Sequence, residues 1–295
     1  HKVGGGKAEL FHGEIRINRN GVILKYGGLV QGFPREINEH LNLLLSIAQK
    51  LGYVDKPGNL ALDFGCGIGA TVSAMLARGM DAHGVDVGEW WGKDHDAYWH
   101  DSPIPSEQIR SRLSATSESQ YRLPYPDDHF DLIVSSQVFE HVFNYADVFR
   151  ELARVMKPGA VSVHIFPGRG TPVEPHVYVP IVPLAKKDWW LRLWALVKRR
   201  HHHTWRAEFE YLRDQMRSNN YPSRMDLYAA AESAGASLTF REDVYLESYR
   251  GRPYKILQAA GHIGLRGTLA PLVQRMCQRT MVVTKGAPHD LFSER

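Results

Sequence analysis

Apolar residues recur along most of the chain at two spacings, one that suits helices and one that suits buried strands. Residues 35–52 carry apolar side chains at helical spacing and end at Gly52, which predicts an amphipathic helix. Before it, apolar runs within residues 14–26 flank Asn20-Gly21, a dipeptide that favours a tight β-hairpin. We therefore expect residues 1–54 to form an N-terminal hairpin and helix that cap the rest of the chain.

Short apolar runs and helical patterns then alternate over residues 55–167. The runs predict strands at 60–64, 82–85, 130–135 and 160–166, and the helical patterns fall at 69–79 and 145–156. Strands that alternate with helices of this length are typical of a parallel sheet covered on both faces.

The alternation stops at residues 168–222, which hold five prolines and three adjacent histidines, and we interpret this segment as an inserted lid. Residues 223–295 resume the pattern as the C-terminal half of the core. A helix is predicted there at 225–234 and strands at 236–247 and 279–285, with a second insertion at 247–278 between the strands.

Charge is distributed unevenly along the chain. The formal net charge is +4, yet residues 168–222 hold ten Lys/Arg against five acids, and residues 247–278 hold five against one. Two basic insertions on an acidic body indicate an anionic partner: a phosphorylated substrate, an anionic membrane surface or nucleic acid. The alternative is a pair of well-solvated insertions with no such partner.

Cysteine content and the N-terminal sequence bear on the compartment. Cys66 and Cys277 are the only cysteines, too few for a disulfide framework or a Cys-rich zinc site, and this low count suits a reducing compartment. Residues 1–30 contain no apolar signal-peptide core, and no apolar run reaches the roughly 20 residues needed to span a bilayer. We expect a cytoplasmic protein.

A glycine-rich turn joins the first predicted strand to the helix after it. Residues 63–69 read Asp-Phe-Gly-Cys-Gly-Ile-Gly. Glycines allow a sharp turn and a close backbone approach to a ligand, and the following helix N-terminus presents N–H groups to it. A tight turn without a ligand is the alternative, and a dinucleotide site has a similar motif with its third glycine one position later.

Three further motifs follow at fixed intervals. Asp86 ends the run Gly84-Val85-Asp86 at a strand terminus, where a carboxylate can accept both ribose hydroxyls of a nucleoside. Residues 123–135 read Leu-Pro-Tyr-Pro-Asp-Asp-His-Phe-Asp-Leu-Ile-Val-Ser, and residues 154–159 read Arg-Val-Met-Lys-Pro-Gly.

In this order and spacing, the four motifs resemble the class I S-adenosylmethionine-dependent methyltransferases, most of all the ubiquinone/menaquinone-type small-molecule group. The resemblance covers residues 55–167 well and 223–285 weakly. It implies an α/β, Rossmann-like fold with a seven-stranded sheet, helices on both faces and strand seven antiparallel, to which the lid is added. It also implies S-adenosylmethionine as the cofactor.

The same resemblance assigns cofactor contacts. It implies that Gly65–Gly69 wrap the methionine and ribose end, that Asp86 holds the ribose hydroxyls and that Val87 packs on the adenine. An Asp usually contacts the adenine amine just before the Leu-Pro pair, but residues 117–120 here are Ser-Glu-Ser-Gln, so Glu118 or the backbone of Ser119 and Gln120 is expected instead. The full set of expected cofactor-binding residues is Asp63, Phe64, Gly65, Cys66, Gly67, Gly69, Asp86, Val87, Glu118, Ser119, Gln120 and Ser136.

Histidines supply the candidate catalytic bases. Methyl transfer is an in-line displacement from a sulfonium, for which the enzyme aligns the partners and removes a proton where needed. His141 follows the strand at 130–135, and His176 lies in the run Glu174-Pro175-His176; both can titrate near neutral pH. Packing or surface histidines are the alternative for both, and His164 falls on a predicted strand, where a sheet residue is the simpler interpretation.

Two Asp- and His-rich runs were weighed as metal sites. Residues 94–96 and 100–101 read Asp-His-Asp and His-Asp, but loops of this composition usually hold no ion. His201–His203 follow two arginines and lack an acid or cysteine spaced to close a zinc site. We predict no metal from the sequence.

Residues 189–197, Trp-Trp-Leu-Arg-Leu-Trp-Ala-Leu-Val, lie between Lys186-Lys187 and residues 198–200, Lys-Arg-Arg. Trp190, Trp194 and Val197 share a helical face. A basic-flanked, Trp-rich amphipathic helix is typical of a peripheral membrane contact, here through residues 186–200 at the inner face of the membrane. A lid helix that packs its aromatic side chains over the active site is the alternative, and the two are compatible.

The leading functional hypothesis is methylation, at oxygen, of a small or lipid-linked and anionic acceptor: a glycan, a glycolipid precursor or a related metabolite. The alternative is a quinone-type C-methyltransferase or another natural-product methyltransferase. Nucleic-acid methylation is disfavoured because residues 135–138 read Ser-Ser-Gln-Val where enzymes that methylate base amines usually carry Asn/Asp-Pro-Pro-aromatic. The intact glycine loop disfavours a non-catalytic binding module.

Overall fold

The computed structural model describes residues 35–92, 99, 102–117, 121–198 and 204–285. The hairpin predicted at 14–26, both Asp/His-rich runs and His201–His203 lie outside the described residues, as do Glu118, Ser119 and Gln120.

One seven-stranded sheet forms the centre of the molecule, in the order β3-β2-β1-β4-β5-β7-β6. The first five strands pair in parallel, and β7 runs antiparallel to both β5 and β6. The predicted α/β fold with an antiparallel seventh strand is therefore confirmed. The strands are β1 (Leu60–Phe64), β2 (Asp81–Asp86), β3 (Leu113–Ala115), β4 (Phe130–Ser136), β5 (Met156–Phe166), β6 (Ala236–Phe240) and β7 (Arg279–Lys285).

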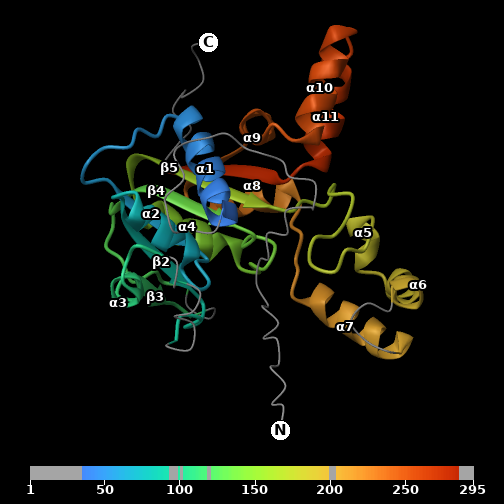
Figure 1. Cartoon of the computed structure of the whole chain (residues 1–295), viewed down its shortest axis with the longest axis horizontal. Coiled ribbons are helices and arrows are strands. Elements are labelled where there is room, and N and C mark those ends of the chain that lie inside the picture. The colour runs from blue at the N-terminus through green and yellow to red at the C-terminus, as the bar shows by residue number, and fades with distance from the viewer. Residues whose placement is uncertain (1–34, 93–98, 100–101, 118–120, 199–203, 286–295) are drawn as a thin grey trace.

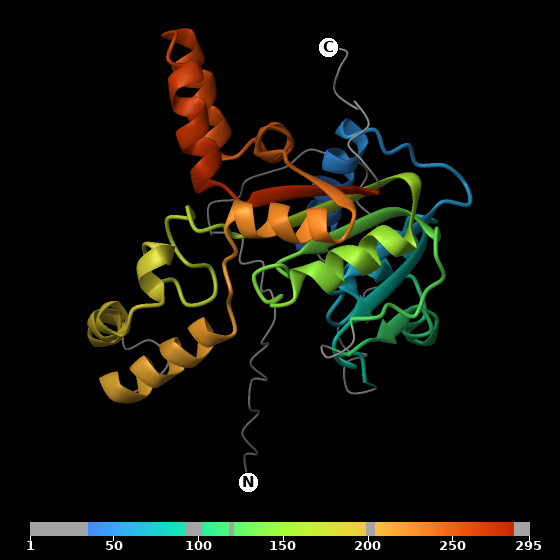
Figure 2. The same cartoon turned by 180° about the vertical axis from the view of Figure 1, so that it is seen from behind.

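Helices cover both faces of the sheet. One face carries α1 (Arg35–Lys50), α2 (Ala70–Ala77) and α9 (Glu242–Tyr249), as Figure 1 shows, and Figure 2 shows α4 (Tyr145–Val155) and α8 (Arg224–Ser233) on the other. The short α3 (Ser106–Arg110) precedes β3 at the sheet edge. Each helical layer encloses its own buried apolar cluster against the sheet.

Amphipathic spacing explains why these helices dock as they do. In α4, Val148, Phe149, Leu152 and Val155 are buried while Arg150 faces solvent, which is the i, i+4, i+7 stripe of a half-buried helix. The stripe packs with α8 and the apolar face of the sheet in one cluster. Burial of this stripe fixes α4, and with it the loop that leads from β4 into the helix.

The predicted strand boundaries are wrong in two places. The strand expected at 236–247 ends at Phe240, and α9 begins at Glu242. Glu242 and Asp243 lie in the first turn of α9, where acidic side chains interact favourably with the helix dipole, so the apolar residues after them pack as a helix face. Strand β5 begins earlier than expected, because Met156 pairs with Phe130 across a register shift.

The described part of residues 168–222 lies beside the sheet and contains α5 (Val182–Ala185), α6 (Asp188–Lys198) and α7 (Trp205–Arg217), which enclose a third apolar cluster. Within the second insertion, α10 (Arg252–His262) and α11 (Arg266–Met276) form a hairpin that projects from the body (Figures 1 and 2). Among the described residues, no helix combines the length and apolarity needed to cross a bilayer.

The order of the strands changes direction between β1 and β4, and we call the region outside the carboxyl ends of β2, β1 and β4 the crevice. The chain leaves β1 through α2 on one face, and it leaves β4 through α4 on the other. At such a switch point the two connecting loops diverge, and ligands bind outside the carboxyl ends of the strands. The loops concerned here are residues 65–69 after β1 and 137–141 after β4.

Candidate functional site

The glycine-rich turn after β1 is held tightly against β2. The N–H groups of Gly65 and Cys66 both donate to the Val85 carbonyl, at 2.8 and 3.1 Å, and Gly69 N–H donates to the Cys66 carbonyl at 2.8 Å. Gly65, Gly67 and Gly69 all have positive φ, at 77°, 51° and 77°, a region in which other residues are strained. The turn therefore delivers the chain into the N-terminus of α2 in a conformation that requires glycine.

Two of these glycines also have no room for a side chain. A Cβ on Gly65 would lie 2.2 Å from Val138 Cγ2, and one on Gly69 would lie 2.7 Å from Leu113 Cδ1. A Cβ on Gly67 would meet nothing within 4 Å. Gly65 and Gly69 thus bring neighbouring elements into contact, while Gly67 leaves open space at the crevice.

Asp86, at the carboxyl end of β2, connects the turn to the next loop. Its Oδ2 accepts from Gly67 N–H at 2.7 Å, and its Oδ1 accepts from Val87 N–H at 2.8 Å and Trp90 Nε1 at 3.0 Å. A carboxylate has about four acceptor positions, and three are used here. Because the Trp90 side chain is 41% exposed, its indole is the partner that a ribose hydroxyl can displace.

Asp63 lies beneath the turn, almost fully buried. Burial, and then the negative charge of Asp86, raise its pKa to about 7, while a hydrogen bond from Thr71 opposes the shift. A carboxyl group that keeps its proton up to about pH 7 can donate a hydrogen bond as well as accept one.

Replacing Asp63 by Asn should change how stability depends on pH. In the folded chain Asp63 keeps its proton up to about pH 7, whereas the unfolded chain releases it near pH 4. Ionisation therefore favours the unfolded state, and the contribution of Asp63 to stability falls as pH rises from 4 to 7. We expect the free energy of unfolding of Asp63→Asn, relative to wild type, to rise by about 2–4 kcal/mol over that range.

Urea denaturation at pH 4.5, 5.5, 6.5 and 7.5 measures this difference. Asp81→Asn is the matched control, since Asp81 lies at the opposite end of β2 with a side chain 45% exposed. Parallel stability curves for Asp63→Asn and wild type would show that the two chains bind the same protons and that the pKa of Asp63 is not raised.

The other residues expected to bind the cofactor differ in solvent exposure. Phe64 and Cys66 are buried, and burial raises the pKa of the Cys66 thiol, with Asp63 and Asp86 adding to the shift. Val87 is 43% exposed beside Asp86, and Ser136 is half-buried at the end of β4. The structure thus places Val87 and Ser136 on opposite sides of the turn, with Phe64 and Cys66 as packing beneath it.

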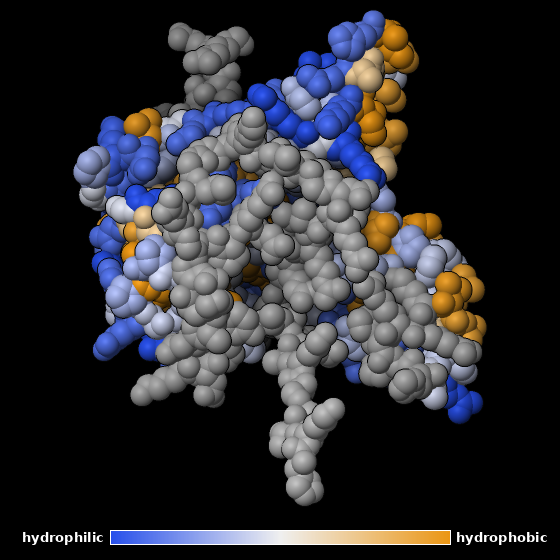
Figure 3. Space-filling model, viewed as in Figure 1, coloured by the Kyte–Doolittle hydropathy of each residue, from blue (hydrophilic) through white to orange (hydrophobic). Residues whose placement is uncertain are grey.

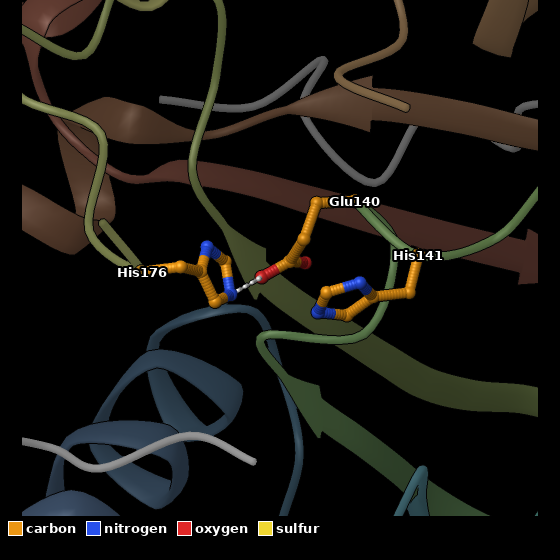
Figure 4. A group of neighbouring side chains, drawn as sticks. All are labelled: Glu140, His141 and His176. Carbon is orange, nitrogen blue, oxygen red and sulfur yellow. Dashed lines mark ion pairs between the residues drawn. The ribbon is translucent and has the colours of Figure 1, made fainter. Parts of the chain in front are cut away.

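Three titratable side chains converge beyond the carboxyl ends of β4 and β5 (Figure 4). Glu140 and His141 lie in the loop after β4, and His176 lies in the segment after β5; one donor atom of each falls within 4.8 Å of the others. The imidazole centroids are 5.2 Å apart, and His176 Nε2 is 3.9 Å from Glu140 Oε1. The Glu140 carboxylate points between the two rings.

Glu140 is completely buried. Burial raises the pKa of this carboxyl to about 8, and the charge of Glu174 adds to the rise, although its own backbone N–H and His176 oppose it. Within the described residues, neither carboxylate oxygen meets the geometry of a hydrogen bond. A buried carboxylate without hydrogen bonds is costly, so this group requires an explanation in terms of function.

Both histidines are oriented through Nδ1. His141 Nδ1 lies 3.0 Å from the Ser218 carbonyl, and His176 Nδ1 lies 2.6 Å from Glu174 Oε1. Because a carbonyl oxygen only accepts, His141 Nδ1 carries the proton, and in the neutral ring the lone pair is on Nε2. For His176, burial lowers the pKa, but the hydrogen bond and charge of Glu174, with the charge of Glu140, raise it above its usual value.

Glu174 is held by a dense set of donors. It is fully buried, yet its Oε2 accepts from Val177 N–H at 2.6 Å and its Oε1 accepts from the Tyr221 hydroxyl. Burial would raise its pKa, but the hydrogen bonds from His176, Tyr221 and Val177 lower it below the usual value. Glu174 is therefore a fixed acceptor that sets the direction of the His176 ring.

The sequence singled out His141 and His176 but not Glu140, Glu174 or Tyr221. Two local signals were present: Glu140 stands next to His141, and Glu174 stands two residues before His176. Tyr221 carried no such signal, because only the folded chain brings residues 218–221 against the loop after β4, where Asn220 N–H donates to the Glu140 carbonyl at 2.5 Å. His164 is buried between Ser135 and Ser162 in the sheet, which agrees with its interpretation as a sheet residue.

The apolar side chains of α6 are divided between the third apolar cluster and solvent. Trp190 and Trp194 are half-buried against the third apolar cluster, and Trp190 Nε1 donates to the Pro180 carbonyl at 2.8 Å. Val197, predicted to share their face, is 65% exposed. The apolar residues of α6 that face solvent are instead Trp189, Leu193, Leu196 and Val197.

Comparison with known proteins identifies the family. A family model described as a methyltransferase domain matches residues 35–239. The chain belongs to the class I S-adenosylmethionine-dependent methyltransferases. Its cofactor is accordingly S-adenosylmethionine.

Curated relatives of this methyltransferase act on different acceptors. A sterol 24-C-methyltransferase of Gibberella zeae is 26% identical over 132 residues, which cover 44% of this chain and 32% of that protein. A ubiquinone biosynthesis O-methyltransferase of Hahella chejuensis is 30% identical over 115 residues, which cover 38% of this chain and 46% of that protein. The matches thus span 32% and 46% of the lengths of these relatives.

Among solved structures, a phosphoethanolamine N-methyltransferase 2 of Haemonchus contortus, in complex with S-adenosylmethionine, has a TM-score of 0.44 and 15% sequence identity to this methyltransferase. The match covers 83% of this chain and 53% of that one.

Proposed function

We propose that this methyltransferase transfers the methyl group of S-adenosylmethionine to a hydroxyl oxygen of a small or lipid-linked acceptor, such as a glycan, a glycolipid precursor or a related metabolite. The observation that carries the proposal is the convergence of Glu140, His141 and His176 beside the cofactor crevice. Val138 contacts the backbone of Gly65 and lies only two residues before Glu140. Glu140 and His141 therefore lie in the same loop as Val138, the residue that contacts the glycine-rich turn.

The reaction balances with the groups present. An oxygen lone pair of the acceptor attacks the methyl carbon, the carbon–sulfur bond breaks, and its electron pair neutralises the sulfonium to give S-adenosylhomocysteine. The hydroxyl proton must leave, and a hydroxyl is too weak an acid to lose it unaided at neutral pH. The Nε2 lone pairs of His141 and His176 are suited to receive that proton.

Cofactor binding falls to residues of the β1–β4 crevice. In this proposal Gly65–Gly69 surround the methionine and ribose, Asp86 accepts from the ribose hydroxyls in place of Trp90, and Val87 packs on the adenine. Ser136 lines the side nearest β4, and Asp63, Phe64 and Cys66 support the turn from below. Residues 1–54, 55–167, 168–222 and 223–295 would then serve as cap, cofactor half, acceptor lid and C-terminal half of the core.

Methylation assays with labelled S-adenosylmethionine test the proposal. A panel of phenolic, glycosidic and lipid-linked alcohols should yield an O-methyl product with wild-type protein, and His141→Asn or His176→Asn should lower kcat by about 100-fold or more. The affinity for S-adenosylhomocysteine should stay within about threefold, because neither histidine lies at the cofactor turn.

His262→Asn is the control for these variants, since His262 is an exposed histidine on α10. Methyl transfer to carbon in place of oxygen would support the alternative, a quinone-type C-methyltransferase, which the carbon-methylating sterol relative favours. Full activity in both histidine variants would contradict the role given to the cluster.

A lipid-linked acceptor also requires access to a membrane surface. Figure 3 shows apolar side chains along the outer edges of α6 and of the α10–α11 hairpin, on the same side of the molecule. In α6 these are Trp189, Leu193, Leu196 and Val197, and in the hairpin they are Ile256, Ile263, Leu265, Leu272 and Met276. Lys186, Lys187 and Arg192 around α6, with Arg252, Lys255, Arg266 and Arg275 on the hairpin, are all exposed.

Apolar residues mixed with basic ones suit the surface of an anionic bilayer. We infer a peripheral contact through residues 186–200, supported by the hairpin, at the inner face of the membrane. In that arrangement the lid meets the surface from which a lipid-linked acceptor would enter the site.

Binding to vesicles measures this contact. The double variant Trp189→Glu/Leu193→Glu should bind vesicles containing anionic lipid about 10- to 100-fold more weakly, because two exposed apolar side chains can no longer enter the interface. Met225→Glu is the matched control, since Met225 is 80% exposed but lies on α8, one of the helices that cover the sheet. Equal vesicle binding by the double variant and wild type would rule out α6 as the contact.

A further inference from the structure

We propose that Glu140, His141 and His176 bind one divalent transition-metal ion between them. Their donor atoms come from two loops and meet within 4.8 Å. Two imidazoles with one carboxylate form a ligand set that proteins use for zinc and iron and that leaves further coordination positions open. The sequence predicted no metal here because the two halves of the set lie about 35 residues apart.

The buried carboxylate is the first independent sign of a ligand. Glu140 has no exposed surface, and no side chain of the described residues donates a hydrogen bond to either oxygen. Its nearest partner in the cluster is the His176 ring, whose Nε2 lies 3.9 Å from Oε1. An ionised carboxylate in this position needs a partner to offset its desolvation, and a cation between it and the two rings would supply one.

The tautomers of the histidines are the second sign. His141 donates through Nδ1 to the Ser218 carbonyl, and His176 lies against Glu174 through its own Nδ1. Both rings therefore direct Nε2 toward Glu140, as Figure 4 shows. A metal-binding histidine almost always donates its other N–H to a carbonyl or carboxylate, which fixes the ring and raises its basicity.

Glu174 completes this outer arrangement around His176. It is itself anchored by Val177 N–H and the Tyr221 hydroxyl, so that the chain Tyr221–Glu174–His176 ends at the Nε2 atom that faces Glu140. A carboxylate–histidine–metal series of this kind has conserved geometry in metal sites. A histidine serving only to pack would not require so many fixed partners.

The distances require a small closure on binding. Two donors held about 2.1 Å from one ion can be no more than about 4.2 Å apart. The His176–Glu140 separation of 3.9 Å already satisfies this limit, whereas the widest separation within the cluster, up to 4.8 Å, must shorten by about half an ångström or more.

The donor set also selects the class of ion. Imidazole nitrogen suits Zn²⁺, Mn²⁺, Co²⁺ or Fe²⁺, whereas Mg²⁺ and Ca²⁺ prefer sites made of oxygen ligands. Toward the reaction, the inference rests on the proposed function: the open positions would receive the acceptor hydroxyl. A bound ion would lower the pKa of that hydroxyl, and His141 and His176 would then serve as ligands through the same Nε2 atoms that receive the proton in the metal-free mechanism.

Metal binding is measured without any methylation assay. The protein is stripped with a chelator and titrated with Co²⁺ by absorption spectroscopy and with Zn²⁺ by calorimetry. Because His201–His203 can bind such ions non-specifically, every variant is made in a background where these three residues are serine. We expect one equivalent of metal to bind to this background protein.

Glu140→Gln and His176→Asn should weaken metal binding by at least about 100-fold, and Glu174→Gln, which removes only the outer partner, by about 10- to 100-fold. His262→Asn should bind as tightly as the background. Unchanged affinity for S-adenosylhomocysteine verifies that each variant is folded. Absent metal binding, or binding that survives Glu140→Gln, would overturn the inference.

Two results separate this inference from the proposed function. Methyl transfer to oxygen by chelator-treated protein that binds no metal would support the proposed function and refute the metal site. Stoichiometric metal binding that depends on Glu140, in a protein that methylates none of the hydroxylated acceptors, would support the site and refute oxygen methylation.

Discussion

Asp86→Ala should weaken binding of S-adenosylmethionine and S-adenosylhomocysteine by about 100-fold or more. Hydrogen bonds to a charged group each contribute about 1.5–3 kcal/mol, and two ribose hydroxyls depend on this carboxylate in the proposed complex. The substitution also removes the acceptor of the Gly67 N–H, at 2.7 Å, so the turn loses one of its contacts with β2. Both effects act on the cofactor and leave the sheet intact.

Calorimetric titration with S-adenosylhomocysteine provides the measurement. Asp81→Ala is the matched control, because Asp81 is the first residue of β2, at the opposite end of this strand from Asp86. Its side chain forms an ion pair with Arg112 at 2.7 Å. This variant should bind the ligand as wild type does. If Asp86→Ala bound within about threefold of wild type, the ribose would not be held by this residue, and the site would have to be placed elsewhere in the crevice.

The fold could be predicted where its signals are local. The strand at 60–64 and the one at 279–285 have the predicted boundaries, because buried strands in a covered sheet are continuous apolar runs bounded by polar residues. The three-residue strand β3 was not predicted, since it is too short for a pattern. The strand predicted at 236–247 failed because apolar residues of a short helix face and of a strand look alike over so few positions.

The candidate site also has one part that the sequence predicts and one part that it does not. The glycine turn and Asp86 belong to consecutive strand ends, so their spacing along the chain already predicts their meeting at one sheet edge. The cluster at Glu140 is different, because it forms only when the segment containing His176 and residues 218–221 folds back over the end of β4. Proline-rich, irregular segments carry no periodicity, and their contacts depend on tertiary packing alone.

Phe64 and Cys66, which both belong to the glycine-rich motif, are also held by packing. Phe64 is buried and lies 6.1 Å from Phe139, between ring centroids, and Cys66 packs where a side chain on Gly84 would clash with it at 2.8 Å. Such positions are specified by the close approach of β1 and β2. A motif therefore records packing and ligand contact together, and the structure is needed to separate them.

Gly65→Ala tests that separation and should destabilise the protein by about 2–5 kcal/mol. Adopting a positive φ costs a non-glycine residue about 1–2 kcal/mol, and overpacking a tight contact costs about 1–3 kcal/mol. Here φ is +77° and the added Cβ would lie 2.2 Å from Val138 Cγ2. Since Val138 precedes Glu140 by two residues, its displacement should also weaken cofactor binding and disturb the acceptor side.

Gly79→Ala isolates the backbone contribution, because Gly79 also has φ of +77° but a Cβ there would meet nothing within 4 Å. It should lose only about 1–2 kcal/mol.

In the double variant Gly65→Ala/Val138→Ala, the Val138 methyl groups that clash are gone, so the steric part of the loss should be recovered as a favourable coupling free energy. Chemical denaturation of wild type, Gly65→Ala, Val138→Ala and the double variant completes this double-mutant cycle. Equal losses for Gly65→Ala and Gly79→Ala, or no coupling with Val138, would mean that the turn does not depend on close contact with the loop after β4, and that the cofactor and acceptor sides of the crevice are built independently.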